Sequence, residues 1–161
     1  MFGLLKDVQV TGKANTVINC KCDIVFNFVG ANFFKNYPRW SPEVKDLKML
    51  SSAPVKIGTL CKQVRVDQGN RSESTFQVTA FTEGRRICFE GTTSPFRCDY
   101  ALEPATQENS SRITFTFELL KLEMYMKPFE KLVRMAIQDG TEKTVSNIKK
   151  LVEEEVGSVS K

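Results

Sequence analysis

The stretch from residue 127 to about residue 155 constrains the fold more than any other part of the sequence. Apolar or small side chains recur there at steps of three and four residues, which predicts one long amphipathic helix. At about 1.5 Å per residue such a helix is about 40 Å long, enough to cross a small domain. Pro128 suits its first turn, where a missing N–H costs nothing. The predicted apolar face comprises Phe129, Leu132, Val133, Ala136, Ile137, Gly140, Thr144, Ile148, Leu151 and Val152.

Most of the chain before this helix alternates apolar and polar side chains and is divided by turn residues, which predicts β-strands. The clearest alternation covers residues 113–119, where Ile, Phe, Phe and Leu are separated by Thr, Thr and Glu. Gly12 is expected to form a bulge or bend in the first strand. The seven predicted strands span residues 8–18, 44–50, 59–66, 74–81, 86–90, 96–103 and 113–119.

One or two short helices are predicted between the first two strands. A helix begins near Asp23, a residue that suits the positive end of the helix dipole, and ends at Gly30. The aromatic residues at 33–40 then form a compact turn around Pro38. Consecutive strands joined by short turns are antiparallel, and a sheet with one apolar face needs a cover. We therefore expect an α+β fold in which a seven-stranded antiparallel sheet wraps around the long C-terminal helix.

Length and charge narrow the class of protein. The 161 residues fit a single domain that spans residues 1–161 and has its own core. The net charge is +4, and its 23 basic and 19 acidic residues are interspersed, without the basic run of a nucleic-acid-binding protein. Residues 1–10 lack the pattern of a signal peptide, and no segment has the roughly 18 apolar residues of a membrane span. We expect a cytoplasmic protein without stable membrane insertion.

The cysteine and histidine content bears on metal sites and cofactors. Five cysteines, an odd number without CxxC spacing, and the complete absence of histidine argue against a disulfide framework and the usual zinc sites. We expect reduced thiols, no metal and no cofactor. Cys20 and Cys22 could form a redox or metal pair, although a one-residue spacing at a strand end favours neither.

Four stretches of the chain, taken in order, carry a family resemblance. Residues 17–40 contain Asp23-x-Val25-Phe26 at a helix start and Asn36-Tyr-Pro-Arg-Trp40. Residues 54–59 read PVKIGT, residues 85–91 read RRICFEG, and YALEP at 100–104 is followed by SRITFTF at 111–117. Over roughly residues 8–152 the chain resembles the START-like (SRPBCC) superfamily, and within it the polyketide cyclase/dehydrase-type proteins. Lys21 stands where family members usually have a small residue or proline, so the first loop is expected to differ.

That resemblance implies a helix-grip fold with an apolar cavity between the curved sheet and the C-terminal helix. Inward-facing side chains of the sheet and helix would line the cavity, unless they simply fill the core. Gly140 lies inside the helix, where glycine costs about 1 kcal/mol relative to alanine. It marks either space for a ligand or a hinge that admits one, or else a close approach of helix to sheet or a tolerated local weakness. The candidate ligand-binding residues are Trp40, Phe76, Val78, Phe89, Phe96, Tyr100, Phe115, Phe117, Phe129, Val133, Ala136 and Gly140.

Without histidine, a Ser–His or Cys–His pair is impossible within one chain. Tyr100, on the inward register of its strand, is the single candidate catalytic group, and a core tyrosine is the alternative. The carboxylates Glu90, Asp99, Glu103 and Glu118 fall on the outward register. The remaining polar candidates, which could anchor an anionic head group or simply be surface charges, are Arg39, Arg86, Arg97 and Arg134.

Three functions remain open. The first is binding, and perhaps transport, of a hydrophobic small molecule such as a lipid, isoprenoid, quinone or polyketide, by a monomer or homodimer that binds no nucleic acid. The second is a cyclase or dehydratase that folds a polyketide-like chain in the same cavity. The third is a protein-interaction module with a collapsed cavity. An open cavity would favour the first two, and a filled interior the third.

Overall fold

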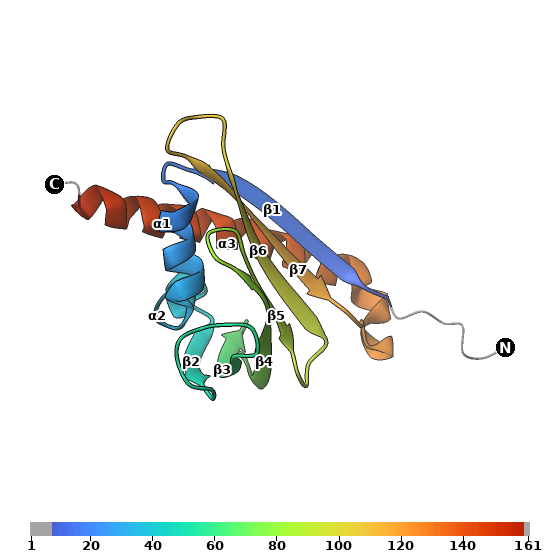
Figure 1. Ribbon diagram of the computed structural model, residues 1–161. Helices are drawn as coiled ribbons and strands as arrows, with labels where there is room; N and C mark the ends of the chain where they lie inside the picture. The colour runs from blue at the N-terminus through green and yellow to red at the C-terminus, as the bar shows by residue number, and fades with distance from the viewer. Residues whose placement is uncertain (1–7, 160–161) are drawn as a thin grey trace.

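The computed structural model describes residues 8–159, with side chains described as far as Val156. The prediction that residues 1–10 contain no signal peptide falls mostly on residues 1–7, which lie outside the described residues. In chain order the elements are β1 (Val10–Ile18), α1 (Cys22–Phe26), the π-helical turn η1 (Asn27–Ala31), α2 (Phe33–Trp40), β2 (Val44–Met49), β3 (Leu60–Asp67), β4 (Asn70–Thr82), β5 (Arg86–Gly91), β6 (Phe96–Pro104), β7 (Ser111–Leu119), the 3-10 helix η2 (Met124–Phe129) and α3 (Glu130–Val159) (Figure 1).

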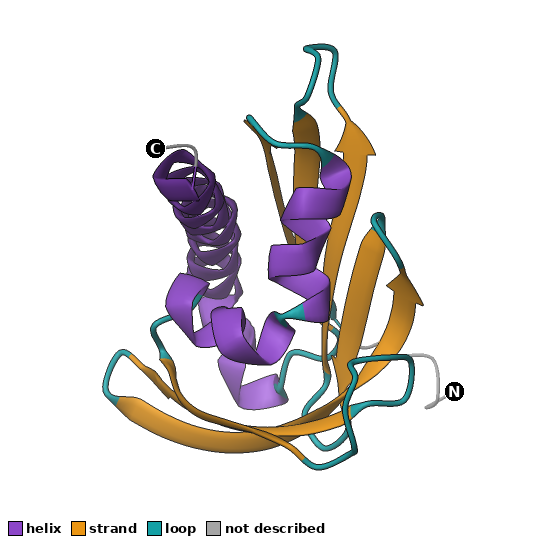
Figure 2. Cartoon of the chain, turned by 60° about the vertical axis from the view of Figure 1, so that its left-hand side comes forward, coloured by secondary structure: helices purple, strands orange, loops and turns teal. Residues whose placement is uncertain are grey.

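The strands form one antiparallel sheet in the order β1-β7-β6-β5-β4-β3-β2. The sheet curves around the helices, so that α3 and the shorter helices lie on its concave side (Figure 2). This confirms the predicted α+β fold, with seven antiparallel strands, two short helices between the first two strands and a long C-terminal helix. Among the helices of residues 8–159, none is both long and apolar enough to cross a membrane.

Gly12 does not form a bulge, so that prediction is wrong. β1 pairs with β7 in an uninterrupted register, with Gly12 opposite Phe117. A Cβ placed on Gly12 would lie 2.7 Å from Ile137 Cγ2 and 3.1 Å from the Ile137 carbonyl oxygen. The glycine is therefore explained by the close approach of α3 to β1, since any side chain there would push the helix away.

The predicted aromatic turn is in fact the helix α2, and the helical segment before it continues past Gly30 to Ala31. Phe33, Tyr37 and Trp40 recur at steps of four and three residues, and all three are buried. A helix gathers these rings on one face, and burying that face outweighs the loss of one backbone hydrogen bond at Pro38.

The long helix begins at Glu130 rather than at residue 127, because Pro128 lies in the preceding 3-10 helix η2. Proline disfavours the α conformation for the residue before it, here Lys127. The buried face also differs from the prediction. It runs through Thr141, Val145, Ile148 and Val152, while Gly140 is exposed.

α3 lies along β1, the edge strand, and covers its free backbone groups. The Gln138 side chain accepts a hydrogen bond from the Lys13 N–H and donates one to the Lys13 carbonyl. Arg134 donates to the Gln9 carbonyl and Lys149 to the Val17 carbonyl. Exposed edge strands invite pairing with other chains, so these side chains both fix the helix and close the edge.

Candidate functional site

One end of the concave interior is solidly packed with aromatic rings. Phe76 and Phe89 have ring centroids 4.6 Å apart, and Tyr100 and Phe115 are equally close. Trp40 donates a hydrogen bond from Nε1 to the Tyr100 hydroxyl at 3.3 Å. Because these rings contact one another, this end of the fold is core and leaves no room for a ligand between them.

The structure divides the twelve predicted ligand-binding residues into three groups, and their role in binding remains a prediction. The residues in the closed aromatic end are Trp40, Phe76, Val78, Phe89, Tyr100 and Phe115, all buried. The half-buried residues are Phe96, Phe117 and Val133. The exposed residues, all on the helical side, are Phe129, Ala136 and Gly140.

The half-buried residues mark a part of the concave side that remains open. The Phe96 and Phe117 rings stack with centroids 6.2 Å apart and planes 9° apart. Phe117 pairs with Gly12, and a Cβ on Gly12 would collide with Ile137, so the stacked pair lies on the side of the sheet that faces α3 near Ile137. A Cβ built on Gly140 would meet no atom within 4 Å. The first half of α3 (residues 130–140) therefore borders open space at Gly140, an exposed position.

A connected set of polar groups, here called the polar chain, lies on the inner face of β3 and β4 and on α2. Arg65 Nη1 donates to the Tyr37 hydroxyl at 2.9 Å, and that hydroxyl donates to Gln63 Oε1 at 3.0 Å. Gln63 Nε2 then donates to Ser74 Oγ at 3.2 Å. Tyr37 and Gln63 are buried, whereas the side chain of Arg65 is 26% exposed and Ser74 is half-buried.

The polar chain retains donors for a ligand. Arg65 uses Nε and Nη2 for a bidentate pair with Asp67, and both N–H groups of Nη1 for Tyr37 and Ser41. One of the five guanidinium N–H groups, on Nη2, therefore has no acceptor in the described part of the chain. The Ser74 hydroxyl proton likewise lacks one within residues 8–159. Both unused donors belong to partly exposed side chains.

Burial and the Arg65 charge set the protonation of the neighbouring groups. Burial raises the pKa of Tyr37, although the Arg65 guanidinium acts in the opposite direction. Burial also raises the pKa of the Cys98 thiol, and Arg65 is close enough to oppose that shift. Tyr37 is therefore a neutral donor at pH 7.

The polar chain is absent from the predicted site residues, although β3 carries a signal for it in the sequence. Gln63 and Arg65 follow the fully buried Cys61 at two-residue steps along β3, so all three side chains lie on the inward face of the strand. An arginine on the buried face of a strand needs partners, which would have made Arg65 a better candidate than the outward arginines. Tyr37 could not be found this way, because its segment was predicted as a turn.

The other predicted polar groups are placed as follows. Tyr100 is buried in the aromatic end, and burial raises its pKa well above the usual value. The outward arginines are all engaged in ion pairs, which supports the surface alternative. The pairs are Arg39 with Glu155, Arg86 with Asp99, Arg97 with Glu118 and Glu90, and Arg134 with Glu130.

The cysteines show no sign of a redox or metal pair. All five are free thiols, and Cys22 Sγ accepts a hydrogen bond from Arg85. Within residues 8–159, no group of three or more His, Cys, Asp or Glu side chains could hold a metal ion.

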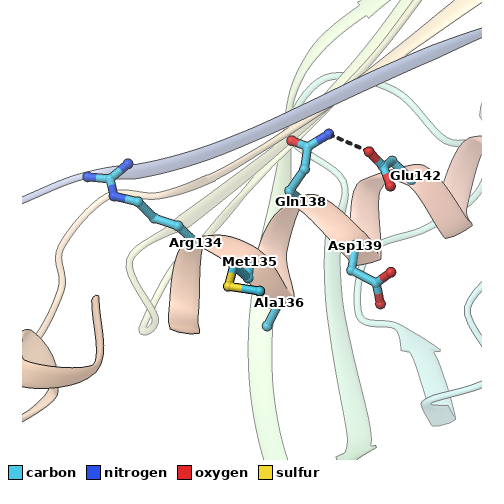
Figure 3. A pocket seen from close by; sticks show the side chains of 6 residues that line it. All are labelled: Arg134, Met135, Ala136, Gln138, Asp139 and Glu142. Atoms are coloured by element: carbon cyan, nitrogen blue, oxygen red, sulfur yellow. Dashed lines mark hydrogen bonds between the residues drawn. The ribbon is translucent and has the colours of Figure 1, made fainter. Parts of the chain in front are cut away.

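Two surface depressions are also present. One, of about 640 Å³, lies on the first half of α3, where Ala136 and Asp139 point away from the side that Gln138 presents to β1 (Figure 3). The other, of about 520 Å³, is lined by Lys21, Arg85 and the loop between β6 and β7. Both are open to solvent, and neither is lined by the stacked Phe96 and Phe117.

Comparison with known proteins places this geometry in context. Residues 8–153 match the model of a family described as polyketide cyclase/dehydrase and lipid transport. No curated protein matches the chain.

Three solved structures share the fold. The Zhui aromatase/cyclase from Streptomyces sp. R1128 superposes with a TM-score of 0.76 at 10% identity, covering 92% of this chain and 96% of that one. A START superfamily protein from Mycobacterium smegmatis gives 0.72 at 15% identity, with coverage of 89% and 97%. Truncated norcoclaurine synthase from Thalictrum flavum gives 0.69 at 14% identity, with coverage of 94% and 98%.

Proposed function

Because the chain belongs to the polyketide cyclase/dehydrase and lipid transport family, within the START-like superfamily, we propose that it binds a hydrophobic small molecule on its concave side. The ligand lies against the stacked Phe96 and Phe117 and the first half of α3. The observation that carries this proposal is the half-buried stack of Phe96 and Phe117 on the concave side, and open space at the exposed Gly140 of α3 agrees with it. Affinity comes from removing this apolar surface from water, at about 25 cal/mol per Å² before ordering costs.

The polar chain adds a requirement on the ligand. The free donors of Arg65 and Ser74 favour a molecule with at least one acceptor oxygen, such as the carbonyl of a quinone or polyketide or the carboxylate of a fatty acid. A purely hydrocarbon ligand would leave these donors to water. Ligands with an oxygen at one end are therefore expected to bind more tightly than hydrocarbons of equal size.

The first experiment is native mass spectrometry, with organic extraction, of protein purified from its own host. We expect a stoichiometric apolar compound, whose chemical class then sets the panel for thermal-shift titration. Gly140→Leu fills the free space without touching the aromatic core, and should weaken binding at least tenfold. Lys150→Leu, an exposed change on the same helix, is the matched control and should bind normally. Finding only the ligand-free protein, together with no thermal shift from lipids, quinones or polyketide-like compounds, would contradict the proposal.

A second candidate function is that of a cyclase or dehydratase, and the polar chain is the observation that favours it. An Arg65 N–H donated to a ligand carbonyl would stabilise the negative charge that develops on that oxygen during carbon–carbon bond formation. Tyr37, kept neutral by burial, holds the guanidinium in place. Turnover that falls with Arg65→Lys or Tyr37→Phe, while ligand affinity changes little, would support an enzyme. Equal loss of affinity and turnover would indicate binding alone. Tyr100→Phe tests the remaining candidate, Tyr100.

A further inference from the structure

A strip of apolar side chains on η2 and the first half of α3 projects into solvent. Each of its members is between 51% and 74% exposed. The last three follow one another at steps of three residues, so they lie on one side of the helix. The apolar strip consists of Met124, Tyr125, Phe129, Leu132 and Met135. Five large exposed apolar side chains within twelve residues are more than the scattered exposure that a soluble surface normally shows.

The strip is accompanied by basic side chains that have no ion-pair partner. Lys121, Lys127 and Lys131 are all exposed, and none of them forms a salt bridge within residues 8–159. Of the two acidic residues in the same segment, Glu130 is paired with Arg134 and Glu123 is unpaired. The segment 121–135 thus carries four basic and two acidic residues, and its unpaired charge is mainly positive.

We propose that the apolar strip and its three lysines form a docking surface for an anionic lipid bilayer. The chemistry is complementary, since apolar side chains can enter the boundary between head groups and acyl chains while the lysines remain at the anionic head groups. From Met124 onward the backbone of the segment is helical, so its N–H and C=O groups are largely satisfied before it leaves water. Tyr125 adds an amphipathic ring of the type that is enriched at membrane interfaces.

A protein partner explains these features less well. A protein interface typically has arginine and few lysines at its apolar centre. Here the accompanying free cations are lysines, which suit loose contact with many lipid phosphates and carboxylates better than fixed pairing. Docking goes beyond the proposed ligand binding and does not require it, although a bilayer at this face would place lipid next to the open part of the concave side.

Co-sedimentation with vesicles tests the docking surface. The probes are vesicles of phosphatidylcholine alone and of phosphatidylcholine mixed with phosphatidylserine. We expect binding to the mixed vesicles, at least tenfold weaker binding to the neutral ones, and a steep loss with added salt. Tyr125→Trp adds a reporter on the strip, whose emission should shift to the blue with mixed vesicles, because the native Trp40 is buried and shielded from lipid.

Matched variants separate the strip from general charge and apolar content. Leu132→Ser with Met135→Ser should weaken vesicle binding about tenfold, whereas Ile57→Ser, at a residue as exposed as Leu132 (63% each), should not. Lys127→Glu with Lys131→Glu should weaken it at least tenfold, whereas Lys45→Glu with Lys56→Glu, which alters the net charge equally, should have a much smaller effect. All these positions are exposed, and unchanged melting temperatures would confirm that the variants fold.

Three results would overturn the proposal. The first is no preference for anionic vesicles, and the second is equal weakening by strip and control variants. The third is a concentration-dependent dimer that Leu132→Ser with Met135→Ser dissociates while vesicle binding persists, because the strip would then contact a second copy of the chain. Gly140→Leu distinguishes this proposal from ligand binding, since it should block the ligand and leave vesicle binding intact.

Discussion

The two halves of α3 differ more than any other neighbouring parts of the molecule. The second half (residues 141–156) presents Val145, Ile148 and Val152 to the core, and Asn147 donates a hydrogen bond to the Trp40 carbonyl. The first half is fixed mainly to β1, while Leu132 and Met135 face solvent. One continuous helix therefore packs into the core at one end and exposes apolar side chains at the other.

The amphipathic pattern of a helix therefore shows where its apolar surface lies, but not whether the rest of the fold covers that surface. The same three- and four-residue spacing runs through both halves, but only the second half is covered by the fold itself. The apolar surface left on the first half is available to a ligand or a bilayer.

The largest expected difference between the halves is in core stability. Ile148→Ala should reduce the free energy of unfolding by about 3 kcal/mol, because it leaves a cavity around a fully buried position. Leu132→Ala should change it by less than about 0.5 kcal/mol, because Leu132 is already in water. Urea unfolding monitored by Trp40 fluorescence measures both. Similar losses from the two substitutions would mean that the first half is packed in solution.

Two glycines sharpen the comparison. Gly12→Ala should destabilise the fold by about 1–3 kcal/mol, because its Cβ would collide with Ile137 and its backbone. Gly140→Ala should instead stabilise it by about 1 kcal/mol, since alanine favours a helix and nothing lies within 4 Å. Thermal unfolding of the ligand-free proteins provides the measurement. Destabilisation by Gly140→Ala would show that the space beside the helix is not free.

The smallest expected effect depends on pH and concerns the second half alone. Partial burial acts to raise the pKa of Glu153, but hydrogen bonds from Lys149 and the Asn19 N–H lower it overall. Because the pKa of Glu153 is lower in the folded than in the unfolded state, its carboxylate stabilises the fold at pH values above the unfolded-state pKa of about 4.3. That contribution is lost as the pH falls through the folded-state pKa. Glu153→Gln should therefore destabilise the protein at pH 7, by less than about 1 kcal/mol because the carboxylate is partly exposed. The difference from the parent should vanish at acidic pH, and a constant difference would contradict this assignment.

The sequence was sufficient for the arrangement of strands and the long helix, because burial on one face leaves period-two and three-to-four-residue patterns. It was insufficient where the structure depends on contacts between distant segments. The local sequence around Gly12 favours a bulge or bend, whereas the residue that explains this glycine, Ile137, lies far along the chain. Pro38 favours a turn in the segment that forms α2, although the spacing of its aromatic rings is helical.

The candidate site was only partly accessible to prediction. The register of the sheet correctly separated inward Phe96 and Phe117 from outward Glu118, because alternation is a local property. The register alone cannot show which inward residues are buried in the closed aromatic end and which are only half-buried. This depends on how far α2 and α3 extend over the sheet. The Arg65–Tyr37 contact joins β3 to a helix, so the register of β3 can mark Arg65 as an inward arginine but cannot identify Tyr37 as its partner.

Amide hydrogen exchange along α3, read by mass spectrometry on peptides from each half, tests the central claim most directly. Few buried contacts should let amides of residues 131–140 exchange at least tenfold faster than those of residues 145–152 in the ligand-free protein. Adding the compound extracted from the host protein should slow exchange in the first half and leave the second unchanged. Equal protection of both halves without the compound, or no added protection with it, would contradict a ligand site on the first half of α3.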